Sequence, residues 1–171
     1  MSLEKLTTKR LILKPIDESV AKDIFNNFTK EVTKYMFPSA PKHIDETLDF
    51  IHAVQKNRTE LKDFVYSIHL KDSDEFIGGV GLHHLESDIP ELGIWTKVSS
   101  HGNKYGREAI TALVELAKKL EYHTLKYPVD CKNIASKKIP ISLGGKLIKE
   151  HEIVKTPSGR ILDQEIYYIE I

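Results

Sequence analysis

The sequence predicts an α/β (α+β) domain in which a mixed, mostly antiparallel sheet of about seven strands is flanked by helices. The spacing of apolar residues changes along the chain from the helical period to strict alternation and back again. Short polar turns separate the central strands, which indicates an antiparallel meander. A long helical stretch joins two later strands, which indicates a right-handed parallel crossover. We expect one domain over residues 1–171, a length that can bury a full core.

The first part of the chain predicts a strand, two helices and a loop between them. Residues 10–16 are expected to form the strand, and Asp17 is expected to cap a helix that reaches Phe28. Residues 34–42 contain two prolines and predict a loop. The second helix follows from an apolar stripe formed by Ile44, Leu48, Ile51, Val54 and Leu61.

The rest of the chain completes the sheet. Strands are expected at 64–70, 76–82, 92–98, 124–131, 146–154 and 161–170, with turns at 71–75 and 157–159. A long amphipathic helix is expected after Gly106 and a short one at 134–143. Pro140 removes the hydrogen bond that the Ser136 carbonyl would otherwise accept. We therefore expect a kinked or 3₁₀-like short helix with Ser136 in its first turn.

Composition and charge exclude several classes of protein. Lys+Arg and Asp+Glu balance at 25 each, so no global field favours nucleic acid or an anionic membrane as a partner. The single cysteine, Cys131, excludes an intramolecular disulfide and a cysteine-based zinc cluster, and no metal is expected. No stretch approaches the roughly 20 apolar residues of a membrane span, and the first residues lack a signal-peptide core. We expect a cytoplasmic protein.

The most informative stretch for chemistry is Glu91–Ala109. An apolar strand runs into a loop with Gly102 and Gly106, and the loop opens directly onto the long helix. Backbone N–H groups and the helix dipole at such a point favour an anion, most commonly a phosphate. A P-loop of a nucleotide triphosphatase would require lysine and a hydroxyl after the second glycine, but Arg107 and Glu108 follow it. That class is excluded.

This stretch resembles the acyl-CoA pyrophosphate loop of the GNAT acetyltransferases, whose pattern is Arg/Gln-x-x-Gly-x-Gly/Ala. Lys104 stands where the family has its first glycine, and the six positions read His101, Gly102, Asn103, Lys104, Tyr105 and Gly106. The element order resembles the GNAT fold over nearly the whole chain, and the initial TTKRLILKPI is similar to the RimJ/RimL-like branch. The resemblance implies a single GNAT-like domain whose loop amides hold the pyrophosphate of acetyl-CoA, with side-chain contacts from His101 and Lys104.

The same resemblance implies roles for two residues of the short helix. The residues from Asn133 to Ser136, followed by SLGG at 142–145, are similar to the RimJ/RimL pattern N-x-x-S…L-G-[FY], with Gly145 in place of the aromatic. It implies that Asn133 lies beside the pantetheine arm and that Ser136 protonates the departing thiolate. From the residues alone, Asn133 is a good N-cap, and Ser136 follows three residues later.

Acetyl transfer to an amine also needs a proton acceptor and a donor for the thioester oxygen. Glu91 is the first candidate base, because PELGIW resembles the family's A-E-[IL]-G-[YW]. His83 and His84 are the second candidate, and at most one of them can face the site. By resemblance, the backbone donor lies among Trp95, Thr96, Lys97 and Val98. Residues 35–37 border the acceptor site or belong to the core.

The leading hypothesis is an N-acetyltransferase in which a primary amine attacks acetyl-CoA directly, without a metal. The acceptor is a protein N-terminus or a small-molecule amine, and a homodimer is an open alternative for the assembly. The rival hypothesis is a non-catalytic acyl-CoA-binding or regulatory module, which Lys104, Pro140 and Gly145 favour. The acceptor, the base and the oligomeric state stay open.

Overall fold

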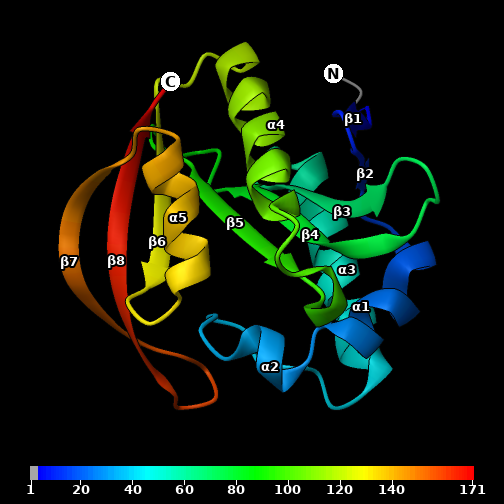
Figure 1. Cartoon of the computed structure of the whole chain (residues 1–171). Helices are drawn as coiled ribbons and strands as arrows, with labels where there is room; N and C mark the ends of the chain where they lie inside the picture. Colours follow the sequence, from blue (N-terminus) through cyan, green and yellow to red (C-terminus); the bar gives the residue numbers. More distant parts are fainter. Residues whose placement is uncertain (1–3) are drawn as a thin grey trace.

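The computed structural model describes residues 4–171, which form one mixed eight-stranded sheet with helices on both faces (Figure 1). The strand order is β1-β2-β3-β4-β5-β6-β8-β7. Within the described residues, β5 and β6 are the one parallel pair. The predicted fold class and the parallel crossover are therefore confirmed. Residues 1–3 of the expected domain lie outside the described part.

The elements follow the predicted order. The strands are β1 (Leu6–Thr7), β2 (Leu11–Pro15), β3 (Phe64–Leu70), β4 (Phe76–His83), β5 (Glu91–Thr96), β6 (Thr124–Asp130), β7 (Lys146–Lys155) and β8 (Ile161–Glu170). The helices are η1 (Glu18–Val20), α1 (Ala21–Asn27), α2 (Lys30–Thr33), α3 (Ile44–Thr59), η2 (Val98–Ser100), α4 (Tyr105–Lys119) and α5 (Ile134–Ser142).

Four local expectations need correction. β1 was not expected, since two residues show no period, and it forms by pairing with β2. The single turn α2 was also not expected. Leu61 lies after α3 rather than on its stripe and is exposed. The strand expected to reach residue 98 ends at Thr96, because a 3₁₀ turn begins at Val98.

Apolar side chains form a separate core on each face of the sheet. On one face, which we call the α4 face, the stripe of α4 packs against alternate residues of β3 to β6 and β8, including Leu92, Leu125 and Tyr127. On the other face, the α3 face, α1 and α3 pack against Val65 and Phe76, with Trp95 at the edge of this cluster. α5 contributes Ile139 and Leu143 to the first core, so it lies on the α4 face.

The short helix α5 is α-helical through Pro140 instead of 3₁₀-like, and Ser136 lies in its first turn as predicted. The helix ends in a Schellman motif: Gly144 has φ +76°, and the N–H of Gly145 donates to the Pro140 carbonyl at 2.8 Å. A Cβ at Gly145 would lie 2.8 Å from that carbonyl oxygen. The proline and the glycine that replaces the family's aromatic are thus coupled in one tight turn.

The partly buried carboxylate of Asp63, just before β3, connects α3 to the end of β4. Asp63 accepts hydrogen bonds from Asn57 Nδ2 at 2.5 Å and from the backbone N–H of His84 at 3.1 Å. His83 Nδ1 lies 3.3 Å from the same carboxylate. The hydrogen bond with His83 contributes most to lowering the pKa of Asp63 from 3.8 to about 2, against burial, which raises it. The ionised form of Asp63 is therefore stabilised by the fold.

We predict that Asp63→Asn destabilises the protein at pH 7 by about 1 kcal/mol. The lowered pKa corresponds to roughly 2 kcal/mol, which solvent screening of this partly exposed group reduces. Because the folded-state pKa is depressed, the contribution is present above pH 3.8 and disappears as the pH falls toward 2. Urea unfolding should show the two proteins converging over that range. A difference that stays constant down to pH 2 would contradict the assignment.

Candidate functional site

β5 and β6 run in parallel but separate soon after they meet. Glu91 pairs with Lys126, and the N–H of Lys126 donates to the Pro90 carbonyl at 2.8 Å. In the described chain no further pair joins these strands, so they diverge toward their C-terminal ends (Figure 1). We call this region, from Leu92 to Thr96 on β5 and from Tyr127 to Asp130 on β6, the β5–β6 fork.

The backbone of β5 turns alternate residues toward the fork. On its other side β5 is fully paired with β4, and the N–H of Lys97 still donates to Ile77 of β4 at 2.8 Å. Because a strand's hydrogen-bonding groups alternate between its two neighbours, Ile94 and Thr96 face the fork. The Thr96 carbonyl accepts from His101 Nε2 at 2.9 Å, with the donor role set by the tautomer. The N–H groups of Ile94 and Thr96 are thus the backbone donors that the fork offers to a ligand.

The glycine loop has left-handed backbone at two positions, one of which is Lys104, the residue that stands at the first glycine of the pattern. Gly102 has φ +84°, and Lys104 has φ +61° and ψ +22°, which is the left-handed conformation that glycine adopts most easily. The loop delivers the chain to the N-terminus of α4, where the first N–H groups have no partner within the helix. Gly106 lies in that first turn, close to Ile94 of β5 and Ile139 of α5. The amides of this turn therefore lie beside the fork.

Arg10 and Glu108 brace the glycine loop from outside. Arg10 Nη2 donates to the Asn103 carbonyl at 3.0 Å, and its Nε donates to Glu108 at 2.7 Å. The same guanidinium lies 4.6 Å from the ring centroid of Tyr105. Burial would raise the pKa of Glu108, but hydrogen bonds from Thr8 and Arg10 outweigh it and lower that pKa. Because Glu108 is matched by Arg10, its charge does not oppose an anion at the helix N-terminus.

Ser136 and Tyr127 form a hydroxyl pair on the α4 face of the fork. Their oxygen atoms lie 2.7 Å apart. Burial raises the pKa of Tyr127 to about 12, although the hydrogen bond with Ser136 lowers it, so this phenol stays protonated. Asn133 caps α5 by accepting from the N–H of Ser136 at 3.3 Å. The sequence analysis did not name Tyr127. Its position three residues before the end of β6, close to the Asn133–Ser136 motif, was the available signal that it lies near the site.

Two candidate bases lie on the α3 face. Glu91 is the first residue of β5 and the residue through which β5 pairs with β6. Its carboxylate lies 3.4 Å from Lys126 Nζ. His83 is opposite Glu91 in register, and its Nδ1 faces Asp63. Its Nε2 lies over Gly93 of β5, at 3.3 Å from where a Cβ would be. His84 has left the strand at φ +58° and is exposed, so His83 is the histidine that reaches β5.

A segment from Phe28 to Pro38 spans the open end of the fork. The Phe28 ring lies 4.8 Å from Trp95 on β5. At the other end, the Arg160 guanidinium, in the turn between β7 and β8, donates to the carbonyls of residues 33, 34, 36 and 38 at 2.9 to 3.2 Å. This bridging segment carries the predicted acceptor residues 35–37, of which Phe37 is half-exposed.

The remaining predicted residues either contact other parts of the fold or are exposed to solvent. Lys97 Nζ lies 2.6 Å from Glu75, Asn103 Nδ2 donates to the Ser100 carbonyl, and Val98 is exposed in η2. Burial raises the pKa of the Cys131 thiol, and nearby carboxylates raise it further.

A hollow of about 1240 Å³ lies elsewhere, between β1, β3 and α4, and shares Lys104 with the predicted site. None of the described helices is both long and apolar enough to cross a membrane.

Known proteins share this sequence pattern and this fold. The family model described as "Acetyltransferase (GNAT) domain" matches residues 10–146. The "Uncharacterized N-acetyltransferase p20" of Bacillus licheniformis is 26% identical over 168 residues, which cover 94% of this chain and 93% of that protein.

Solved structures of similar fold include one with acetyl-CoA and one with coenzyme A. The microcin C7 self-immunity acetyltransferase MccE, in complex with acetyl-CoA and AMP, superposes with a TM-score of 0.85 at 18% identity over 96% of this chain and 94% of that one. RimL, the ribosomal L7/L12 alpha-N-protein acetyltransferase in complex with coenzyme A, gives a TM-score of 0.82 at 16% identity over 98% of each chain. At these identities the structures establish a shared fold.

We predict that Lys104→Gly is more stable than Lys104→Ala by about 1 kcal/mol, because a Cβ in the left-handed conformation is strained and glycine is not. Both variants lack the ammonium, so the comparison isolates the backbone. Chemical unfolding measures the difference. Equal stabilities would show that residue 104 does not hold the left-handed turn in solution.

Proposed function

This chain belongs to the GNAT acetyltransferase family and is an acetyl-CoA-dependent N-acetyltransferase, and we propose that a primary amine attacks the thioester directly within the β5–β6 fork. The GNAT resemblance of the sequence is confirmed by the family match. The observation that carries the proposal is the fork itself, with the α4 N-terminus at its side, a hydroxyl pair on one face and two candidate bases on the other.

The cosubstrate is proposed to enter from the α4 face. The amides of Gly102 to Gly106 bind its pyrophosphate, with the Lys104 ammonium and His101 as side-chain contacts. The pantetheine arm follows the exposed backbone of β5, with Asn133 beside it, and the N–H of Ile94 or Thr96 binds the thioester oxygen as negative charge develops there. The strand alternation supports this role, because Lys97 donates to Ile77 of β4 and the N–H groups of Ile94 and Thr96 therefore point to the other side, toward the fork.

Ser136 is proposed to protonate the departing thiolate. The 2.7 Å contact with Tyr127 supports this, because a protonated phenol that donates to Ser136 Oγ leaves the serine hydrogen for the sulfur. Asn133 holds the first turn of α5 and so fixes where Ser136 points.

Two residues are proposed as the proton acceptor, and the contacts favour His83 over Glu91. Asp63 faces Nδ1 of His83, which directs the proton to that nitrogen and leaves Nε2 as the base above Gly93. Glu91 is held by Lys126, whose ammonium lies 3.4 Å from its carboxylate, so the contact directs this group away from an incoming amine.

The acceptor is proposed to approach from the α3 face, under the bridging segment that Arg160 holds. A protein N-terminus and a small-molecule amine both remain in the proposal. RimL is named as an acetyltransferase of a ribosomal protein and MccE was solved with AMP, so similar folds occur with a protein acceptor and with a bound nucleotide. A cytoplasmic location and a homodimer are proposals as well, and the single cysteine is consistent with a reducing compartment.

The central test measures release of free thiol from acetyl-CoA with a panel of peptide N-termini and small amines. We expect turnover with at least one class, and we expect Ser136→Ala to lower kcat by about 10²-fold while the Kd for acetyl-CoA stays unchanged. Ser142→Ala, at the exposed end of the same helix, is the matched control and should retain activity. Acetyl-CoA binding without thiol release across the panel would favour the non-catalytic binding module.

The base is tested by comparing His83→Gln with Glu91→Gln in kcat/KM against pH. We expect His83→Gln to lower the rate by about 10²-fold and to remove the ionisation that limits it at low pH. His84→Gln, at the exposed neighbouring position, should behave as the wild type. A loss confined to Glu91→Gln would assign the proton transfer to that carboxylate.

A further inference from the structure

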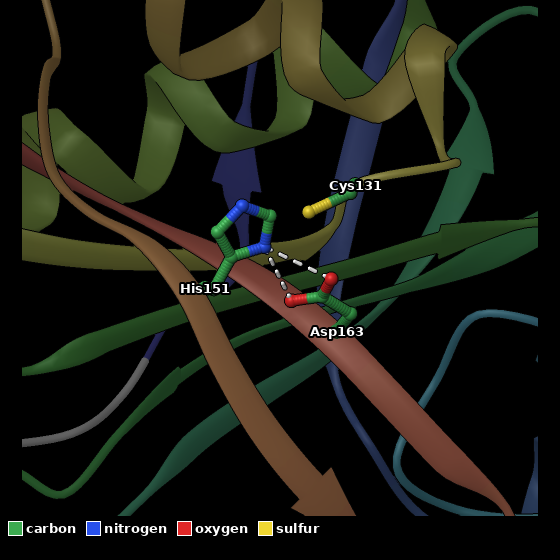
Figure 2. A group of neighbouring side chains, drawn as sticks. All are labelled: Cys131, His151 and Asp163. Carbon is green, nitrogen blue, oxygen red and sulfur yellow. Dashed lines mark hydrogen bonds and ion pairs between the residues drawn. The ribbon is translucent and has the colours of Figure 1, made fainter.

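Three metal-ligating side chains meet outside the proposed catalytic groups. Cys131 follows β6, His151 lies on β7 and Asp163 lies on β8 (Figure 2). One ligand atom from each lies within 4.8 Å of the other two. His151 Nδ1 is 3.1 and 3.0 Å from the two carboxylate oxygens of Asp163.

The backbone holds these residues together from positions far apart in sequence. The N–H of Cys131 donates to the Asp163 carbonyl at 2.8 Å, which extends the β6–β8 ladder by one residue. On β7 the register shifts between Lys149 and Glu152, so that two residues, Glu150 and His151, stand opposite one residue of β8. Such a bulge re-aims a side chain and is common beside functional sites. The cluster therefore rests on three connected segments of the sheet.

The orientation of the imidazole distinguishes a metal site from a nucleophilic triad. In a Cys–His–Asp triad the two ring nitrogens serve different partners, one the carboxylate and the other the nucleophile. Figure 2 shows the sulfur and the carboxylate turned toward the same Nδ1 edge of His151. Zinc ligands at about 2.0 to 2.3 Å from the ion lie roughly 3 to 4 Å apart, so small side-chain rotations bring all three donors onto one ion.

We propose that Cys131 Sγ, His151 Nδ1 and an Asp163 oxygen bind Zn²⁺, with the fourth position open to water. A thiolate and an imidazole select zinc over magnesium or calcium, which prefer oxygen ligands. Binding releases the thiol proton to solvent, moves the imidazole proton from Nδ1 to Nε2, and replaces the His151–Asp163 hydrogen bond with two metal bonds. The ion would connect the edge strand β7 to the end of β6, just before Asn133 and α5.

The test uses the full chain without acetyl-CoA or CoA, because the free thiol of CoA would compete for the metal. Zinc at about 100-fold above its Kd should raise Tm by roughly 5 °C. Co²⁺ should produce the thiolate-to-metal charge-transfer band in the near ultraviolet. Cys131→Ser should abolish that band, and Cys131→Ser and His151→Gln should each weaken zinc binding by at least about tenfold.

The matched control is His52→Gln, because His52 forms another exposed histidine–carboxylate pair, with Glu18 at 2.6 Å. It should bind zinc as the wild type does. The proposal is overturned if zinc leaves Tm unchanged, if the cobalt spectrum lacks the thiolate band, or if zinc stabilises Cys131→Ser as much as the wild type. None of these outcomes depends on acetyl transfer.

Discussion

The separation of β5 from β6 constrains the whole site, because a strand that leaves its neighbour exposes backbone groups that must find partners elsewhere. β5 remains rigid here because its bonds to β4 continue as far as Lys97. Its other edge presents Ile94 to the fork, where an extended ligand with amide groups can pair as an added strand does. The pantetheine arm carries such amides. The contact between Pro90 and Lys126 fixes where the fork begins, and hence how far such a ligand can enter.

The two faces of the sheet separate the two proton transfers of the proposed reaction. Ser136 and Tyr127 lie on the α4 face, where the thiolate is proposed to leave, whereas His83 and Glu91 lie on the α3 face, where the amine is proposed to arrive. The proposed acid and base therefore lie on opposite faces of the sheet, a division that the strand alternation of β5 and β6 provides without any added element.

The sequence predicted the elements whose apolar period is long and local, such as α3 and α4, and the glycine loop whose pattern is contiguous. It could not predict β1 or α2, because two to four residues carry no period and form through tertiary pairing. The contacts that orient the candidate base and the bridging segment could not be predicted for a related reason. Asp63 and His83 are 20 residues apart, and Arg160 binds carbonyls more than 120 residues earlier in the chain. The glycines before His83 were a usable signal, since a Cβ at Gly81 would lie 2.4 Å from its Nε2.

Lys104 shows that a residue other than glycine can hold a left-handed position in this loop. A left-handed residue other than glycine costs about 1 to 2 kcal/mol. The Arg10 guanidinium helps to offset this cost through its hydrogen bonds to Asn103 and Glu108, each worth about 1 kcal/mol or less because Arg10 is exposed to solvent. The turn is thus supported by Arg10, just before β2, and by the start of α4, and the residue at its centre is free to carry a charge. At a proposed pyrophosphate site, an ammonium in that place adds attraction that glycine cannot supply.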